Sequence, residues 1–339
     1  MKKTNSAKKS EYHMNLIFLR AMVLLTLLPA IGFAADPPGI PDGWSDGFVY
    51  DNGVRIHYYH AVPAPGKPVI VMVHGVTDIG LCWTTLTWKL QDSYDIYMLD
   101  TRGHGLSDPF TSSDDGETLI KDVVGFVKVM NIKKPILMGH SMGAATVMRV
   151  GAEYPDLARA VIMLDPFLVP FNPDRRAPQR KTPPNTPKKE AKESSQMEKS
   201  PAKNLPFSMF GDPQTLVAQN NYSYDELVAK ARRENSKWGM VDCQYWALSK
   251  KQYHGAYTKE GQQAMSGTMM TGDALAKITV PSLVLKADAS PEGRKANDEA
   301  VKDLKLVKLV HVDGARHNLH HDELGRTVKE INEFLSDVL

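Results

Sequence analysis

The sequence predicts an α/β protein with a mostly parallel, doubly wound sheet and a helical lid insertion. A chain of 339 residues with 42% hydrophobic side chains is long enough for one large domain. Short apolar runs alternate with amphipathic segments along most of the chain, which is typical of parallel strands joined by helical crossovers. A charged, Pro-rich stretch at residues 172–206 interrupts this alternation and indicates an insertion.

Residues 1–35 have the features of a signal peptide. Basic residues precede the apolar stretch AMVLLTLLPAIGFA, and they are Lys2, Lys3, Lys8, Lys9 and Arg20. Because small residues end that stretch, we expect cleavage after Ala34 or Ala35 and a periplasmic or secreted protein with no stable membrane span. A start at Met14 would give a more ordinary signal. The alternative is a membrane anchor, although the apolar run is shorter than the roughly 20 residues of a span.

Residues 36–171 are expected to form the first part of the core. FVYDNGVRIHYYHA places two alternating apolar runs around Asn52 and Gly53, which predicts a hairpin. The runs PVIVMVHG, YDIYMLD, KPILMGHS and RAVIMLD predict strands, the first of them buried on both faces. Between them, TTLTWKLQDS, GETLIKDVVGFVKVMNI and MGAATVMRVGAEYPD have the apolar spacing of helices.

The lid insertion is expected over residues 172–270. Its first part, 172–206, has almost no large apolar side chains and cannot offset its ordering entropy, so we expect a flexible surface segment. Helices are expected at Thr215–Gln219, Tyr224–Asn235 and Met240–Tyr253, over the carboxyl ends of the strands, where ligands bind in open parallel sheets. Four aromatic residues of this part fit either an apolar pocket roof or, preferably, core: Trp238, Tyr245, Trp246 and Tyr253.

Residues 271–339 are expected to complete the core. PSLVLKAD and LVKLVHVD predict two more strands. ALAKI, GRKANDEAVKDL and HDELGRTVKEINEFLSDVL predict the helices around them.

The stretch GHSMG, Gly139–Gly143, lies between a predicted strand and a predicted helix. A serine hydroxyl reacts only when it is exposed, held still and next to a base. A tight strand-to-helix turn exposes it, and a Cβ at either glycine would crowd that turn. We therefore interpret Ser141 as a candidate nucleophile rather than as part of a Gly-rich turn without chemistry.

His74 and Gly75 end the first long parallel strand. Acyl transfer builds negative charge on a carbonyl oxygen, which two backbone N–H donors can stabilise. The N–H groups of Val76 and Met142 are the expected donors. The alternative is that His74 and Gly75 only shape a turn, and we expect the His74 side chain to be structural.

A base must come from one of eleven histidines. In VHVDGARHNLHHD a strand ends near Asp313, and a Gly-containing loop then presents His317, which we take as the base. His320 and His321 are expected to be exposed at the start of the last helix. His104 is expected to serve turn geometry.

These motifs, with DTRGHGLSD, resemble the α/β-hydrolase fold family over roughly residues 44–171 and 207–339. The family's order along the chain is serine, acid, histidine. Its usual acid turn reads KADASPEG here, with Ser290 at the usual position and Asp288 two residues early. A minority of the family has the acid one strand earlier, where this chain has Asp165 followed by Pro166. The resemblance thus implies Asp165, with Asp288 as the alternative, to orient His317.

The resemblance implies a serine hydrolase that cleaves carboxylic esters of a small, apolar acyl substrate without a metal or organic cofactor. A serine nucleophile argues against the family's dehalogenases and epoxide hydrolases, which use Asp there. Lactone or carbon–carbon bond hydrolysis remains open, as do a lyase, a cofactor-free oxidative enzyme and a non-catalytic binding protein.

The composition adds little about partners. A net charge of +2 gives no reason to expect nucleic acid, and the oligomeric state stays open. Cys82 and Cys243 fit no zinc spacing, and we favour two buried thiols over a disulfide.

Overall fold

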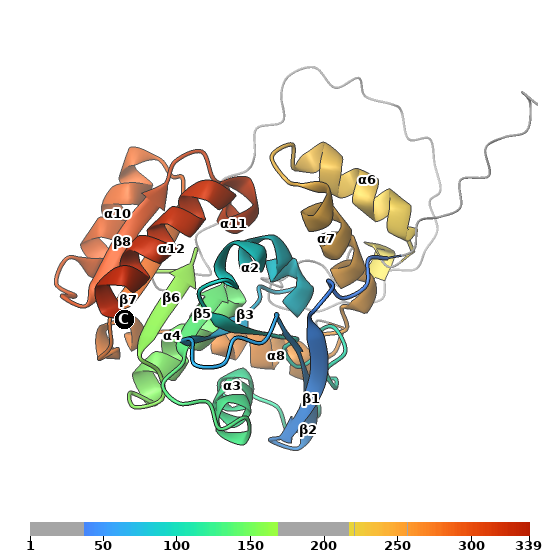
Figure 1. Ribbon diagram of the computed structural model, residues 1–339, viewed down its shortest axis with the longest axis horizontal. Coiled ribbons are helices and arrows are strands. Elements are labelled where there is room, and N and C mark those ends of the chain that lie inside the picture. The colour runs from blue at the N-terminus through green and yellow to red at the C-terminus, as the bar shows by residue number, and fades with distance from the viewer. Residues whose placement is uncertain (1–36, 169–216, 220, 256) are drawn as a thin grey trace, which may run out of the picture. The chain divides into compact units, whose positions relative to one another are not determined.

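The computed structural model describes residues 37–168, 217–219, 221–255 and 257–339. The expected signal peptide, the segment 172–206 and the first two residues of the helix expected at Thr215–Gln219 lie outside them, whereas residues 217–219 are described and helical. The described chain forms one eight-stranded sheet in the order β1-β2-β4-β3-β5-β6-β7-β8 (Figure 1). The predicted α/β fold is confirmed.

The sheet begins with the predicted hairpin. Strands β1 (Ser45–Asp51) and β2 (Val54–His60) pair antiparallel. The two residues between them, Asn52 and Gly53, have φ angles of 50° and 78°, the left-handed conformation that a two-residue type I′ turn requires. Strand β2 also pairs antiparallel with β4 (Asp95–Leu99).

All remaining pairings are parallel, as predicted. They join β3 (Val69–Val73), β4, β5 (Ile136–His140), β6 (Ala160–Leu164), β7 (Ser282–Ala287) and β8 (Val307–Val312). Because side chains alternate along a strand, Ile70 and Met72 enter one core cluster and Val71 and Val73 the other. Both faces of the sheet are therefore covered, which is the doubly wound arrangement.

Each face has its own helices. On one face α2 (Thr84–Leu90) and α12 (Leu324–Val338) pack with the sheet around Trp83, which is 1% exposed. On the other lie α3 (Thr118–Val129), α4 (Met142–Glu153) and the short α9 (Ala274–Lys277). There Phe126 is fully buried. Helix α10 (Pro291–Val301) connects β7 to β8.

The chain between β6 and β7 contains the helical insertion, which includes α6 (Tyr224–Glu234), α7 (Met240–Gln252) and α8 (Lys259–Thr268). Ser223 begins α6 with a capping box to Glu226. Helix α8 was not predicted, because KEGQQAMSGT has few large apolar residues and thus a weak stripe. Trp238, Tyr245 and Tyr253 are buried in packing clusters, which favours the core interpretation.

The closing helix differs from expectation. It is broken at Glu323 (φ −138°) into a short helix α11 (Leu319–Asp322) and α12. The expectation that His320 and His321 are exposed is wrong, because they are 2% and 8% exposed. The break turns α11 inward, so that the His320 ring lies 4.8 Å from that of Trp83 and His321 Nδ1 lies 3.0 Å from a carboxylate of α7.

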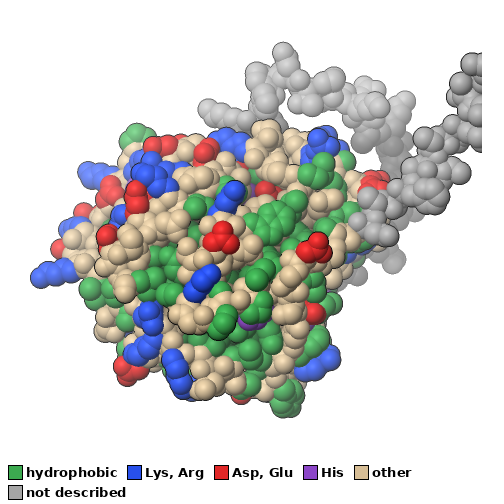
Figure 2. All heavy atoms as spheres, viewed as in Figure 1, with side chains coloured by type: hydrophobic (Ala, Val, Ile, Leu, Met, Phe, Trp, Pro, Cys, Tyr) green, Lys and Arg blue, Asp and Glu red, His purple; other side chains and the backbone are tan. Residues whose placement is uncertain are grey.

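On the face that Figure 2 shows, basic and acidic side chains are mixed over α10 and α12. Arg294 of α10 pairs with Asp288, and Arg326 of α12 pairs with Glu330. No helix in the described ranges is both long and apolar enough to span a bilayer. Cys82 and Cys243 are free, buried thiols, as we favoured.

Candidate active site

Ser141 occupies the bend between β5 and α4, with φ 53° and ψ −113°. A non-glycine residue in this conformation is strained. The neighbouring glycines make the bend possible. A Cβ on Gly139 would lie 2.1 Å from the Gly143 carbonyl oxygen, and one on Gly143 would lie 2.0 Å from that of Val73. Only glycine therefore fits at either position.

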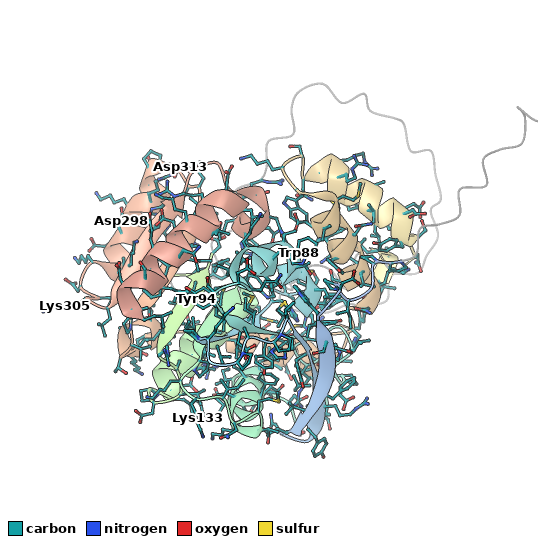
Figure 3. All side chains as sticks on the ribbon, viewed as in Figure 1. Trp88, Tyr94, Lys133, Asp298, Lys305 and Asp313 are labelled. Atoms are coloured by element: carbon teal, nitrogen blue, oxygen red, sulfur yellow. The ribbon has the colours of Figure 1, made fainter. Side chains whose placement is uncertain are left out.

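The structure brings His317 to this serine. Nε2 of His317 lies 2.8 Å from Ser141 Oγ. The imidazole belongs to the loop after β8, beyond Asp313, which Figure 3 labels. Its side chain is 49% exposed, whereas Ser141 is 6% exposed. The hydroxyl is thus held within the fold, while the candidate base faces solvent on one side.

Asp165 completes the chain of hydrogen bonds. It follows β6 with φ 49°, and its Oδ2 lies 2.6 Å from His317 Nδ1. A carboxylate only accepts, so Nδ1–H donates to Asp165 and Nε2 accepts from the Ser141 hydroxyl. Oδ1 of Asp165 meets Lys286 Nζ at 2.5 Å and accepts from Ala287 N at 3.2 Å. Burial raises the pKa of Asp165, but the His317 hydrogen bond and the Lys286 charge outweigh burial and hold this pKa well below its usual range.

Asp288 makes different contacts. Its Oδ1 binds Arg294 at 2.5 Å, and its Oδ2 accepts from Gly314 N at 2.9 Å. These contacts brace the loop that leads to His317 without touching the imidazole. The geometry therefore favours Asp165 over Asp288 as the orienting acid.

The expected oxyanion donors belong to two segments in contact, since Val76 packs against a cluster that contains Met142. Met142 N is the first amide of α4, and Val76 N belongs to the turn after β3. Within the described part of the chain, neither amide donates to a protein acceptor. A free pair of N–H groups beside a serine is what an oxyanion hole requires.

His74 helps to orient the peptide unit between Gly75 and Val76, a contact that the sequence did not suggest. The carbonyl oxygen of Gly75, in the same peptide unit as Val76 N, lies 2.7 Å from His74 Nδ1 and accepts from Asp78 N at 3.2 Å. His74 Nε2 accepts from Thr101 N at 3.0 Å, which leaves the proton on Nδ1. Because the peptide is planar and trans, fixing Gly75 O on one side aims Val76 N–H to the other.

A second histidine that sequence reasoning missed supports the candidate base. His140 Nε2 donates to the His317 carbonyl oxygen at 3.0 Å. Burial lowers the pKa of His140 to about 3, and the neighbouring His317 acts in the same direction. His140 is therefore neutral. No pattern in the sequence indicates this contact, because His140 ends β5 and His317 lies in the loop after β8.

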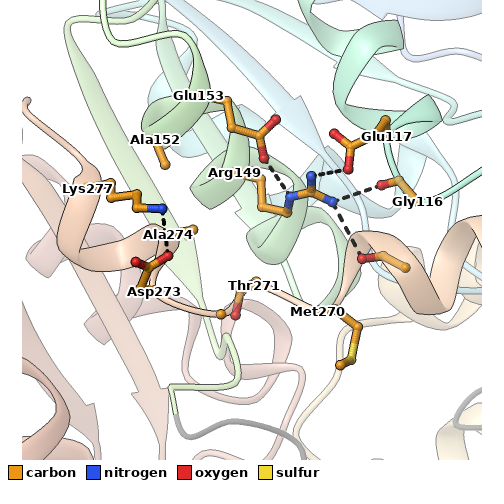
Figure 4. Close-up of a pocket in the computed structure, with 12 residues that line it drawn as sticks. Gly116, Glu117, Arg149, Ala152, Glu153, Met270, Thr271, Asp273, Ala274 and Lys277 are labelled. Atoms are coloured by element: carbon orange, nitrogen blue, oxygen red, sulfur yellow. Dashed lines mark hydrogen bonds and ion pairs between the residues drawn. The ribbon is translucent and has the colours of Figure 1, made fainter.

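A separate hollow of about 430 Å³ lies beside α4 (Figure 4). Arg149 lines this hollow, and its guanidinium binds Glu117, Glu153 and the carbonyl oxygens of Gly116 and Gly267. The arginine is therefore satisfied within the protein, and the candidate catalytic side chains do not line this hollow. The described residues contain no group of three or more His, Cys, Asp or Glu side chains that could hold a metal ion.

Comparison with known proteins identifies the family. A model of the alpha/beta hydrolase family matches residues 70–330, most of the chain, and the chain therefore belongs to this family. The predicted family is confirmed, and with it the prediction of a hydrolase at the level of that family.

Two curated relatives match part of the chain. A 2-(acetamidomethylene)succinate hydrolase of Mesorhizobium japonicum is 33% identical over 98 residues, which is 29% of this chain and 35% of that protein. An N-formylmaleamate deformylase of Pseudomonas putida is 32% identical over 139 residues, 40% of this chain and 50% of that protein. The matches thus span half or less of these relatives.

A solved structure of an N-formylmaleamic acid deformylase from Pseudomonas putida has a TM-score of 0.61 at 20% identity. The alignment covers 85% of this chain and 100% of that one. At this identity the likeness shows the fold alone.

Proposed function

We propose that this protein is an exported serine hydrolase that cleaves carboxylic esters of a small, largely apolar acyl substrate. The observation that carries the proposal is the hydrogen-bond chain from Ser141 through His317 to Asp165, with distances of 2.8 and 2.6 Å. Such a chain activates a serine hydroxyl.

The proposed mechanism has two halves. Ser141 Oγ attacks the acyl carbonyl while His317 Nε2 takes its proton, and the N–H groups of Val76 and Met142 stabilise the oxyanion. His317 then returns the proton to the leaving alkoxide, which departs as an alcohol. Water attacks the acyl-enzyme with His317 again as base, and the carboxylic acid and free Ser141 are released. Asp165 stays ionised and stabilises the imidazolium.

The compounds to be tested as substrates should include more than esters. The names of the two curated relatives, a 2-(acetamidomethylene)succinate hydrolase and a deformylase, are the reason to include amides. Lactones and carbon–carbon bonds belong in it because the same groups can cleave each. A non-catalytic binding protein remains the contrasting hypothesis.

A fluorophosphonate probe tests the catalytic proposal. We expect the protein to be labelled at Ser141 and to hydrolyse short p-nitrophenyl esters, and both properties to vanish in Ser141→Ala. Failure to label the folded protein would favour the binding-protein hypothesis. Ester chain lengths, amides and lactones are then compared by kcat/KM, and a preference for an amide or lactone would overturn the ester assignment.

Export is proposed on the leader alone. Expression of the full chain in a bacterium, followed by mass spectrometry of the periplasmic fraction, is expected to show a new N-terminus near Ala35. An uncleaved protein in the cytoplasmic fraction would contradict export.

A further inference from the structure

Lys250, near the end of α7, reaches the turn that follows β3. Its Nζ lies 2.8 Å from the Thr77 carbonyl oxygen, 2.7 Å from Thr77 Oγ1 and 3.4 Å from Asp78 Oδ1. The side chain is 6% exposed. An ammonium has three hydrogens, and here three acceptors of one turn surround it. Lys250 therefore has no donor left to bind a substrate.

The turn itself is unusual. The Asp78 N–H donates to Gly75 O at 3.2 Å, and Thr77 between them has a φ of 64°. A positive φ at this third position is that of a type II turn, which favours Gly or Asn. A β-branched residue there is strained, and such strain persists only where the surroundings hold it. Lys250 supplies two of the contacts that hold Thr77.

Val76 is the second residue of the same turn, and its N–H is the proposed oxyanion donor outside α4. We propose that Lys250 is a positioning residue for the oxyanion hole: by clamping Thr77 and Asp78 it keeps the Val76 N–H aimed at the developing charge. This inference rests on the proposed function. Lys250 would thus connect the helical insertion to the oxyanion hole.

Helix α7 does not depend on Lys250 for its attachment. Asp242, two turns earlier, accepts from Thr85 Oγ1 at 2.6 Å and lies 3.0 Å from His321 Nδ1. Cys82 Sγ also contacts the Tyr245 carbonyl oxygen at 3.8 Å. Loss of the Lys250 ammonium should therefore leave α7 in place and affect the turn.

The test compares Lys250→Met with Lys251→Met. Lys251 is the next residue on α7, and its Nζ binds the Tyr222 carbonyl oxygen at 3.0 Å, so its substitution removes the same charge away from the turn. Loss of one oxyanion donor costs about 10²–10³-fold in kcat. Displacing a donor should cost less, so Lys250→Met is expected to lower kcat and the rate constant of fluorophosphonate labelling by about 10–100-fold. KM is expected to change by less than about twofold, since the loss concerns the transition state.

A reversible phenylboronic acid separates positioning from a structural role, because its tetrahedral adduct with Ser141 occupies the oxyanion hole. Its Ki should rise in Lys250→Met in proportion to the fall in kcat/KM and stay unchanged in Lys251→Met. In a Thr77→Asn background, Lys250→Met should cost less, because Asn adopts a positive φ more readily.

Three results would overturn the inference: labelling of Lys250→Met at the wild-type rate, an unchanged boronate Ki, or equal losses in the two lysine variants. A wild-type protein that does not label at all would overturn the proposed function, and the inference with it. Circular dichroism of Lys250→Met checks that α7 is retained, and loss of its helical signal would contradict a local role.

Discussion

The substitution Asp165→Asn tests the candidate site most directly, because the structure fixes how the new amide must sit. Lys286 Nζ and Ala287 N both donate toward Oδ1, at 2.5 and 3.2 Å. The amide oxygen must take that place, since an NH₂ group there would face two donors. The NH₂ group then takes the place of Oδ2, 2.6 Å from His317 Nδ1.

This arrangement reverses the tautomer of the candidate base. Facing an NH₂ donor, His317 Nδ1 must accept, so the imidazole proton moves to Nε2. Nε2–H then points at Ser141 Oγ, 2.8 Å away, and cannot take the hydroxyl proton. A wrong tautomer in a serine triad costs about 10⁴-fold in kcat. We expect a loss of about 10³–10⁴-fold here, which is about 4–5.5 kcal/mol of activation free energy.

The assay is steady-state hydrolysis of p-nitrophenyl acetate, with the labelled fraction of Ser141 as a count of active sites. Asp288→Asn is the matched control, since it makes the same change in a carboxylate that contacts Arg294 and Gly314 N. We expect this control to lose less than about tenfold. If Asp165→Asn keeps more than a tenth of wild-type activity while folded, or Asp288→Asn loses as much, the assignment of the acid is refuted.

Three further predictions concern stability, measured by urea unfolding. A Cβ on Gly143 would lie 2.0 Å from Val73 O, whereas one on Gly325 in α12 meets nothing within 4 Å. Gly143→Ala should therefore lower the free energy of unfolding by about 3 kcal/mol, and Gly325→Ala should raise it by about 0.5–1 kcal/mol. Equal effects of the two substitutions would contradict this prediction. Phe126→Ala should cost about 3–5 kcal/mol, since Phe126 is fully buried, and a cost below about 1 kcal/mol would show that the site repacks. Burial lowers the pKa of His57, but two hydrogen-bonded carboxylates outweigh burial and raise this pKa above its usual value. The stability that this gives is complete below about pH 6.5 and is lost as the pH rises through the folded-state pKa. His57→Gln should therefore lower the free energy of unfolding more at about pH 5.5 than at about pH 8.5, and a pH-independent loss would contradict the prediction.

Local sequence patterns predicted most of the sheet. The apolar runs of β3, β5 and β6 are typical of strands buried in a covered parallel sheet. Asn52 and Gly53 favour a tight hairpin turn because both residues adopt positive φ angles there. The patterns failed where local propensity is weak. Helix α8 has no strong apolar stripe, and the break at Glu323 follows from how α11 packs against Trp83 rather than from a Pro or Gly.

The candidate nucleophile and the candidate base could be selected from the sequence because their surroundings are local. Gly139 and Gly143 mark a cramped bend, and His317 follows a strand in a loop. The candidate acid was less certain from the sequence, which preferred Asp165 but kept Asp288 as the alternative, since both residues follow strands that are neighbours in the sheet. The direction of each carboxylate decides between them, and this depends on Lys286 and Arg294, which are far apart from the serine in the chain.

The sequence by itself determined the alternation of strands and helices, the bend at Ser141 and the family to which the chain belongs, because each depends on neighbours a few residues apart. Tertiary structure alone decided which carboxylate meets His317, that His140 holds the His317 carbonyl, and that Lys250 of α7 clamps the turn at Thr77. These contacts join segments separated by more than a hundred residues. A hydrogen bond between such segments is set by packing of the whole fold, and no local spacing encodes it.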